Sequence, residues 1–184
     1  MTNRIIAPAL AIAALVTAQT AHAQQQACVA AADLSDAVVY TMPIAFDAAR
    51  NACANRLTGD GFMANGGEQF IANFRSRQNA SWPGAFRLLK AFMADESRAG
   101  ADMDMTAMIA ALPEDSLRPF VDGMVGQMIA QEIKGDSCAK IERGLELISP
   151  LPTDNVGGLF AFIAELAEMK SPTICGAAPA QAKK

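Results

Sequence analysis

Four cysteines are the residues with the widest chemical repertoire in this 184-residue chain, because a thiol can bind a metal, attack a substrate or form a disulfide. They are Cys28, Cys53, Cys138 and Cys175, and no two of them form the C-x-x-C pair that is typical of zinc and redox sites. The only histidine, His22, lies in a segment that we expect to be removed. An even number of cysteines in an exported chain therefore favours two structural disulfides over a metal centre.

Methionines provide a second candidate site. The segment Met103-Asp104-Met105-Thr106-Ala107-Met108 has M-x-M and M-x-x-M spacing, and thioether sulfur is a soft ligand that suits Cu(I). However, Met105 and Met108 share a helical face with Ile109 and Leu112, and we favour a role for them in the core over copper binding. The mature chain has no histidine to support copper, and we predict no metal and no cofactor. An apolar ligand held between helices would instead be lined by the following methionines: Met105, Met108, Met124 and Met128.

Carboxylate pairs could support general acid–base catalysis, but each pair here also fits a structural role. Asp33 and Asp36 fit the start of a helix, and Glu114-Asp115 follows Pro113, where acidic residues favour a helix N-terminus. Ser-His and Cys-His nucleophiles are excluded, because the mature chain has no histidine and we expect no free thiol. We therefore predict that the protein is not an enzyme.

The N-terminal residues 1–23 have the three parts of a secretory signal peptide. Arg4 is positively charged, Ile5 to Ala18 are apolar, and Ala21-His22-Ala23 is a small-residue cleavage site. Removal takes one of 15 cationic residues, which leaves 14 against 19 acidic residues and a formal charge of −5. We expect a periplasmic or secreted protein with no transmembrane segment in the mature chain, and the absence of a basic face argues against nucleic acid as a partner.

Helical periodicity dominates the mature chain, and strand signals are weak. The pattern predicts a single all-α domain over residues 24–175, built as a small bundle of about seven short helices, followed by a flexible tail over 176–184. Two C-terminal helices are the clearest, one beginning near Cys138 and ending before Pro150, the other beginning at Thr153 or Asp154. The second is predicted to bury one face, made of Val156, Leu159, Phe160, Ile163 and Leu166. The glycines Gly157-Gly158 and Gly123-x-x-Gly126 are expected to allow close helix packing.

Breaks at prolines shape the remaining predictions. Helices are expected over 68–77, from Trp82-Pro83 to about Gly100, over 102–112 and over 117–133. A two-helix hairpin at the C-terminal end would bring Cys138 and Cys175 together, which leaves Cys28 to pair with Cys53. A straight helix from Asp33 to about Ala54 would be about 30 Å long and would keep that second pair apart. The pairing therefore predicts that this helix is broken at Pro43.

The order C…P…C followed by LRPFVDGMVGQMIAQEIKGDSCAKIERGLELISPLPTDN resembles uncharacterised exported α-helical proteins of alphaproteobacterial type. The resemblance implies a periplasmic location and the disulfide pairing given above, and it implies no activity. Two classes of function fit the sequence. The first is a non-catalytic periplasmic interaction or envelope-associated protein with an unknown protein partner. The second is a binding module for an apolar or amphipathic small ligand held between helices.

Overall fold

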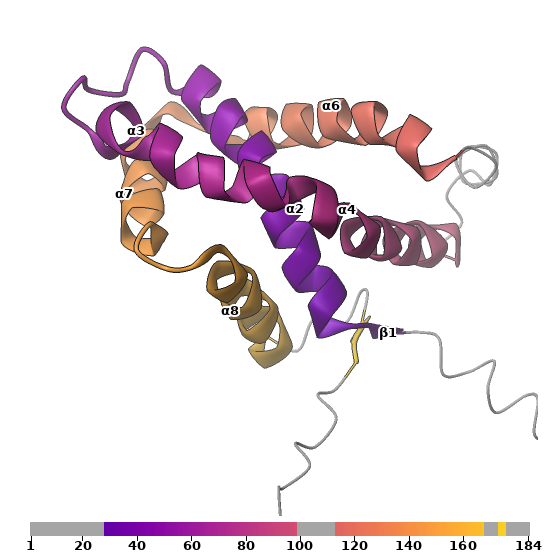
Figure 1. The fold of residues 1–184 in the computed structure, drawn as a ribbon. Helices are drawn as coiled ribbons and strands as arrows, with labels where there is room; N and C mark the ends of the chain where they lie inside the picture. The colour runs from indigo at the N-terminus through magenta and orange to yellow at the C-terminus, as the bar shows by residue number, and fades with distance from the viewer. Residues whose placement is uncertain (1–27, 99–112, 168–172, 176–184) are drawn as a thin grey trace, which may run out of the picture.

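The chain folds around one long helix, α2, as the computed structural model shows (Figure 1). The structure describes residues 28–98, 113–167 and 173–175. The predicted signal peptide, the predicted C-terminal tail and the helix predicted over 102–112 lie outside these residues. The described elements are, in chain order: β1 (Cys28–Val29), α2 (Ala31–Ala52), α3 (Phe62–Asn65), α4 (Gly67–Arg98), α6 (Glu114–Glu132), η1 (Gly135–Ser137), α7 (Cys138–Ile148), α8 (Thr153–Leu166) and β2 (Thr173–Ile174).

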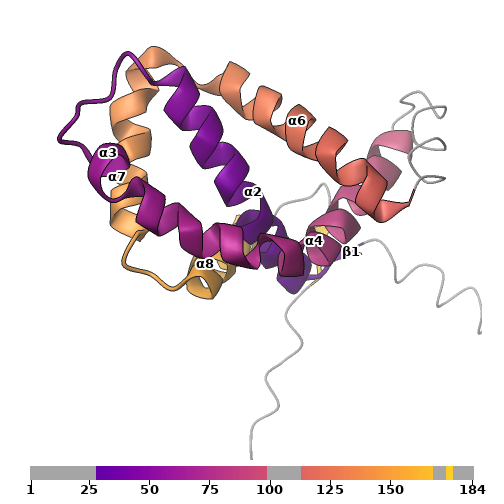
Figure 2. The same cartoon turned by 45° about the horizontal axis from the view of Figure 1, so that its top comes forward.

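The all-α prediction is confirmed, with six α-helices in the described residues where about seven short ones were expected. Helix α2 packs against α4, α6 and α8, and the short helix α3 packs against α4 and α7 (Figures 1 and 2). The two short strands pair in parallel, with Cys28 opposite Thr173 and Val29 opposite Ile174. None of the described helices is long and apolar enough to cross a membrane.

Prolines do not break the helices where the sequence predicted breaks. Helix α2 continues through Pro43, and α4 continues through Pro83, so the two helices expected over 68–77 and from 82 onwards are one. A proline inside a helix removes one backbone hydrogen bond, here the bond that the carbonyl of Val39 would accept. Pro43 is buried in the packed face of α2, and Pro83 lies on the solvent side of α4. Tertiary packing offsets the lost bond in the first case, and water can hydrate the freed carbonyl in the second.

The disulfides join different cysteines from the pairs that were predicted. Cys28 is bonded to Cys175 and Cys53 to Cys138, across 147 and 85 residues of chain. A continuous α2 of 22 residues is about 33 Å long, so a Cys28–Cys53 bond is impossible. Each bond instead fastens one end of α2: the first holds its N-terminal end to β2, and the second holds its C-terminal end to α7. The hairpin argument failed because α8 packs against α2 and α7 packs against α3.

Two buried clusters lie on different sides of α2. The larger one, called here the phenylalanine core, joins α2, α3, α4 and α8 through Val39, Phe46, Ala49, Met63, Phe70, Ile71, Phe74 and Val156. The smaller one, called here the tyrosine–tryptophan core, joins α2, α4 and α6 through Tyr40, Trp82, Ala85, Phe86, Leu117 and Val121. Because α2 contributes Val39 to one cluster and Tyr40 to the other, adjacent residues of this helix face different cores.

Helix α8 buries a different face from the one that was predicted. Val156 is buried as expected, but the larger apolar residues that were grouped with it are exposed. The contact with α2 is made by Val156 together with two small residues, Gly157 and Ala161. A side chain on Gly157 would place its Cβ 2.5 Å from the Oγ of Ser35, so the two helices approach too closely for any larger residue. This confirms the close-packing role expected of Gly157.

Candidate functional site: a cavity between α2, α4 and α6

The tyrosine–tryptophan core contains a cavity of about 150 Å³ between α2, α4 and α6. The atoms that face the cavity are all apolar, including those of Tyr40 and Thr41. The lining residues are Ala37, Tyr40, Thr41, Trp82, Ala85, Leu88, Leu89, Phe92, Val121 and Val125. Phe92 is partly exposed and marks the solvent side of this space. A cavity of this volume can hold an apolar group of about the size of benzene.

The cavity wall owes its shape to three stacked aromatic rings. The ring of Tyr40 lies 5.0 Å from that of Trp82, and the ring of Trp82 lies 5.2 Å from that of Phe86. Trp82 and Phe86 are one helical turn apart on α4, so their side chains lie on the same face of the helix. Small residues beside these rings, Ala37 and Ala85, leave the space between the helices unfilled. The sequence thus combines large rings with alanines, and the cavity results from that combination.

A polar network fixes Tyr40 against α6. The Tyr40 hydroxyl donates a hydrogen bond to Oδ1 of Asp122 and accepts one from Nε of Arg118 at 3.2 Å. Asp122 and Arg118 are four residues apart on α6 and therefore lie on the same face. Burial raises the pKa of the Tyr40 phenol well above its usual range, and the hydrogen bond to Asp122 raises it further. Tyr40 is therefore a neutral hydrogen-bond donor at physiological pH.

The same arginine also stacks on the aromatic wall. The guanidinium carbon of Arg118 lies 5.3 Å from the ring centre of Tyr40 and 6.0 Å from that of Trp82. A cation at this distance from an aromatic face is attracted by the electrons of the ring. Arg118 and Asp122 thus bring charges of both signs to the Tyr40 side of the aromatic wall.

Trp82 carries the one polar atom in the described core that lacks a partner. Its side chain is 4% exposed, and its indole nitrogen Nε1 has no hydrogen-bond acceptor. A buried N–H without an acceptor costs about 1–3 kcal/mol relative to a satisfied one. Trp82 also lines the cavity, but the surface of the cavity is entirely apolar, so the buried Nε1 does not open onto it.

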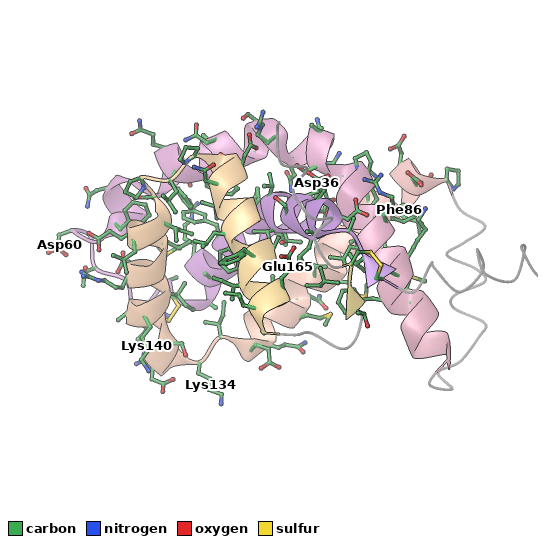
Figure 3. All side chains as sticks on the ribbon, turned by 90° about the horizontal axis from the view of Figure 1, so that it is seen from below. Asp36, Asp60, Phe86, Lys134, Lys140 and Glu165 are labelled. Carbon is green, nitrogen blue, oxygen red and sulfur yellow. A yellow bond between two sulfur atoms is a disulfide. The ribbon has the colours of Figure 1, made fainter. Side chains whose placement is uncertain are left out.

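A second polar contact joins α2 and α4 near Phe86, on the side where Figure 3 labels Asp36 and Phe86 close together. Arg87 forms an ion pair with Asp33 at 2.7 Å, and the buried Ser81 hydrogen-bonds to Asp36. Burial raises the pKa of Asp36, the nearby charge of Asp33 adds to this, and the Ser81 hydrogen bond opposes it. These contacts explain both aspartates as part of the α2–α4 packing.

The predicted methionine site does not coincide with this cavity. Met105 and Met108 lie outside the described residues, and Met124 and Met128 are 39% and 61% exposed on the outer side of α6. The cavity is lined on α6 by Val121 and Val125 instead. Since α6 is apolar on both sides, its sequence could not show which side faces inward. Whether the methionines bind a ligand stays a prediction.

Sequence reasoning identified part of this site without recognising it. The helix predicted from Trp82-Pro83 to about Gly100 contains Trp82 and Leu89, which both line the cavity. Tyr40 was not predicted as a site residue. A usable signal was present, since Tyr40 is the only tyrosine and Trp82 the only tryptophan. The Tyr40 hydroxyl contacts Arg118 and Asp122. Nothing in the sequence links these two residues to Tyr40, which lies about 80 positions earlier in the chain.

Within the described residues, all four cysteines are in disulfides and no cluster of three or more potential metal ligands occurs. Comparison with models of protein families, with curated proteins and with solved structures returns no match. Function must therefore be argued from the cavity and the surface of this chain alone.

Proposed function

We propose that this protein is a non-catalytic binding module for a small amphipathic molecule, held in the cavity between α2, α4 and α6. The observation that carries the proposal is the apolar cavity of about 150 Å³ between the three helices, walled by Tyr40 and Trp82. The ligand would have an apolar body of about six carbon atoms in this cavity and a polar end on the solvent side, beside Phe92.

The location forms part of the same proposal. Two disulfides are typical of proteins that fold in an oxidising compartment, and the predicted signal peptide and the resemblance to exported helical proteins agree with a periplasmic location. Removing a small amphipathic molecule from the periplasm, or sensing it there, needs a stable scaffold and no catalytic group. The covalent closure at both ends of α2 would supply that stability.

The single tryptophan makes the proposal directly measurable. Trp82 fluorescence should change on titration with hexanoate, benzoate or cyclohexane carboxylate, because Trp82 is the only tryptophan and lines the cavity. Ala85→Leu should fill the cavity and weaken binding at least about 10-fold. The matched control is Ala72→Leu, the same change at an exposed position of the same helix, which should leave binding unchanged.

The role of the Trp82 ring can be tested separately. Trp82→Phe keeps an apolar ring in the wall of the cavity, so calorimetry should show benzene and benzoate binding changed by the same factor. If none of these molecules alters Trp82 fluorescence, or if Ala85→Leu binds them as the wild type does, the proposal is wrong.

The first function expected from the sequence, a non-catalytic interaction protein of the envelope, is the second candidate. The observation that favours it is the number of large apolar side chains exposed on α6 and α8, among them Phe120, Met128 and Leu166. Surfaces of this kind commonly mark interaction sites in proteins. Capture of a specific envelope protein, lost on changing these residues, would support this role.

A further inference from the structure

Helix α8 carries apolar residues around most of its circumference, and only part of this apolar surface is covered. The inner face contacts α2 through Val156, Gly157 and Ala161. The outer face carries Leu159, Phe162, Ile163 and Leu166, which are 41%, 54%, 50% and 67% exposed. A helix that is apolar on both sides is normally buried on both sides. Figure 3 views the molecule from the side on which α8, carrying the labelled Glu165, stands in front.

The spacing of the outer residues specifies the shape of what would cover them. Leu159, Phe162, Ile163 and Leu166 are at positions i, i+3, i+4 and i+7, which form one continuous stripe along a helix. We call these four residues the outer stripe. Such a stripe packs best against a second helix, whose side chains can enter the spaces between these residues.

The charged residues of α8 favour a protein partner over a membrane surface. The two charged residues of α8, Asp154 and Glu165, lie off the outer stripe, and Asp154 forms an ion pair with Arg77. Residues 153–166 contain no lysine or arginine, whereas helices that lie on membranes usually carry them on the polar face. The outer stripe therefore suits a neutral apolar protein face, and the stripe of a second copy is such a face.

We propose that two copies of this chain associate through α8, with the two helices antiparallel about a two-fold axis. The axis would pass between Phe162 and Ile163, at the midpoint of the outer stripe, and would set Leu159 of one copy opposite Leu166 of the other. No charged group is buried in this arrangement, because Asp154 and Glu165 stay at the edge. The antiparallel orientation also places the positive end of each helix dipole beside the negative end of the other.

The exposed apolar area agrees with a dimer. Side chains of this size expose about 150–200 Å² each when fully accessible, so the outer stripe presents about 300–400 Å² of apolar surface per copy. Interfaces are about 60% apolar, which corresponds to about 1,000–1,300 Å² of total buried surface for two copies. This is the lower end of the range for specific interfaces, where transient complexes are found.

Sedimentation equilibrium of the mature protein with its disulfides intact tests the proposal. The wild type should show a monomer–dimer equilibrium, and Ile163→Glu should weaken it at least about 100-fold, because a charge at the centre of the stripe would be buried without a partner. The matched control is Phe120→Glu, which places the same charge at a 56% exposed apolar residue of α6 and should leave the equilibrium unchanged.

The sedimentation and vesicle experiments distinguish a second copy from other partners of the outer stripe. A wild type that stays monomeric at several hundred micromolar overturns the proposal, as does a dimer that Ile163→Glu leaves intact. Co-sedimentation of the wild type with phosphatidylcholine and phosphatidylglycerol vesicles, lost in Ile163→Glu, would assign the stripe to a lipid surface instead. Circular dichroism should show equal helix content in all three proteins, since both substituted residues are exposed.

Discussion

The two cores beside α2 are built on different principles although they share a helix. The phenylalanine core is filled by large apolar side chains, with the rings of Phe70 and Phe74 only 5.0 Å apart. The tyrosine–tryptophan core combines its rings with a cavity, a polar network and an unpartnered N–H. A filled core contributes stability, whereas a cavity lowers it, so the second core is the one with a feature that stability alone does not explain.

A disulfide lies beside the phenylalanine core, whereas the helix that covers the tyrosine–tryptophan core has none. The Cys53–Cys138 bond ties α2 to α7 beside the phenylalanine core, and both cysteines are buried. Helix α6, which covers the tyrosine–tryptophan core, contains no cysteine and is held there by apolar contacts and by its hydrogen bonds to Tyr40. The molecule thus joins a half that is closed by a disulfide to a half that holds the cavity and is closed by non-covalent contacts alone.

The largest effect is expected from removing the disulfide beside the phenylalanine core. The double substitution Cys53→Ala and Cys138→Ala should lower the free energy of unfolding by about 4–5 kcal/mol, because the bond closes a loop of 85 residues. Urea unfolding followed by circular dichroism measures this change.

The two disulfides should also differ in how easily they are reduced. Under mild reduction, peptide mapping should show Cys28–Cys175 opening first, since Cys28 is exposed. Faster reduction of Cys53–Cys138 would contradict the prediction that this buried bond is the better protected of the two.

Truncation of a side chain in each core compares the packing directly. Phe74→Ala removes a fully buried ring from the phenylalanine core and should cost about 3–5 kcal/mol. Leu89→Ala, beside the existing cavity, should cost only about 1–2 kcal/mol, because this half-buried side chain already faces empty space. Chemical denaturation of both variants gives the comparison. Equal losses would mean that the cavity is closed by repacking in solution.

Removal of the Tyr40 hydroxyl tests the polar network of the second core. Tyr40→Phe should lower the free energy of unfolding by about 1–2 kcal/mol at pH 7, because Asp122 and Arg118 lose their common partner. The pKa of Tyr40 is raised on folding, so its contribution is complete below the unfolded value of about 10 and is lost as the pH rises above that value. The wild type should therefore lose stability above about pH 10, and Tyr40→Phe should lose less.

Tyrosinate absorbance provides the readout, because Tyr40 is the only tyrosine. In the folded protein it should appear well above the usual pKa of a phenol, and in Asp122→Asn it should appear at lower pH, since one cause of the raised pKa is removed. Ionisation of the wild-type tyrosine at its ordinary pKa without unfolding would contradict the buried network.

The sequence predicted local structure well where one face of a helix is clearly apolar. A helix was predicted from near Cys138 to before Pro150, and α7 spans Cys138–Ile148, because its apolar residues recur every three or four positions. Helices α6 and α8 are apolar on two sides, so periodicity located them but chose the wrong buried face for most residues. In α8 the small residues Gly157 and Ala161 decided the contact, because close approach of two backbones buries more surface than distant contact through large side chains.

Long-range features were beyond local patterns. The disulfide pairing depended on whether α2 continues through Pro43, and that depends on the tertiary contacts of the helix. The cavity depends on Ala37, Trp82 and Val121, which come from three helices. No single helix shows that its neighbours leave a space, so a site of this type appears only once the helices are packed.

The smallest expected effect concerns the polar contact between α2 and α4. The pKa of Asp36 is raised by burial, so its carboxyl group contributes stability below its ordinary pKa of about 3.8 and loses that contribution as the pH rises through the folded value. Asp36→Asn does not titrate and should be more stable than the wild type by less than about 1 kcal/mol at pH 7, with no difference at pH 3. Thermal unfolding at both pH values measures this difference in stability.

The control Asp47→Asn breaks an exposed ion pair with Arg75 and should be slightly destabilising at pH 7. A destabilised Asp36→Asn at pH 7 would instead show that Ser81 and Arg87 outweigh the cost of burial, and the α2–α4 contact would then be held by the ionised carboxylate.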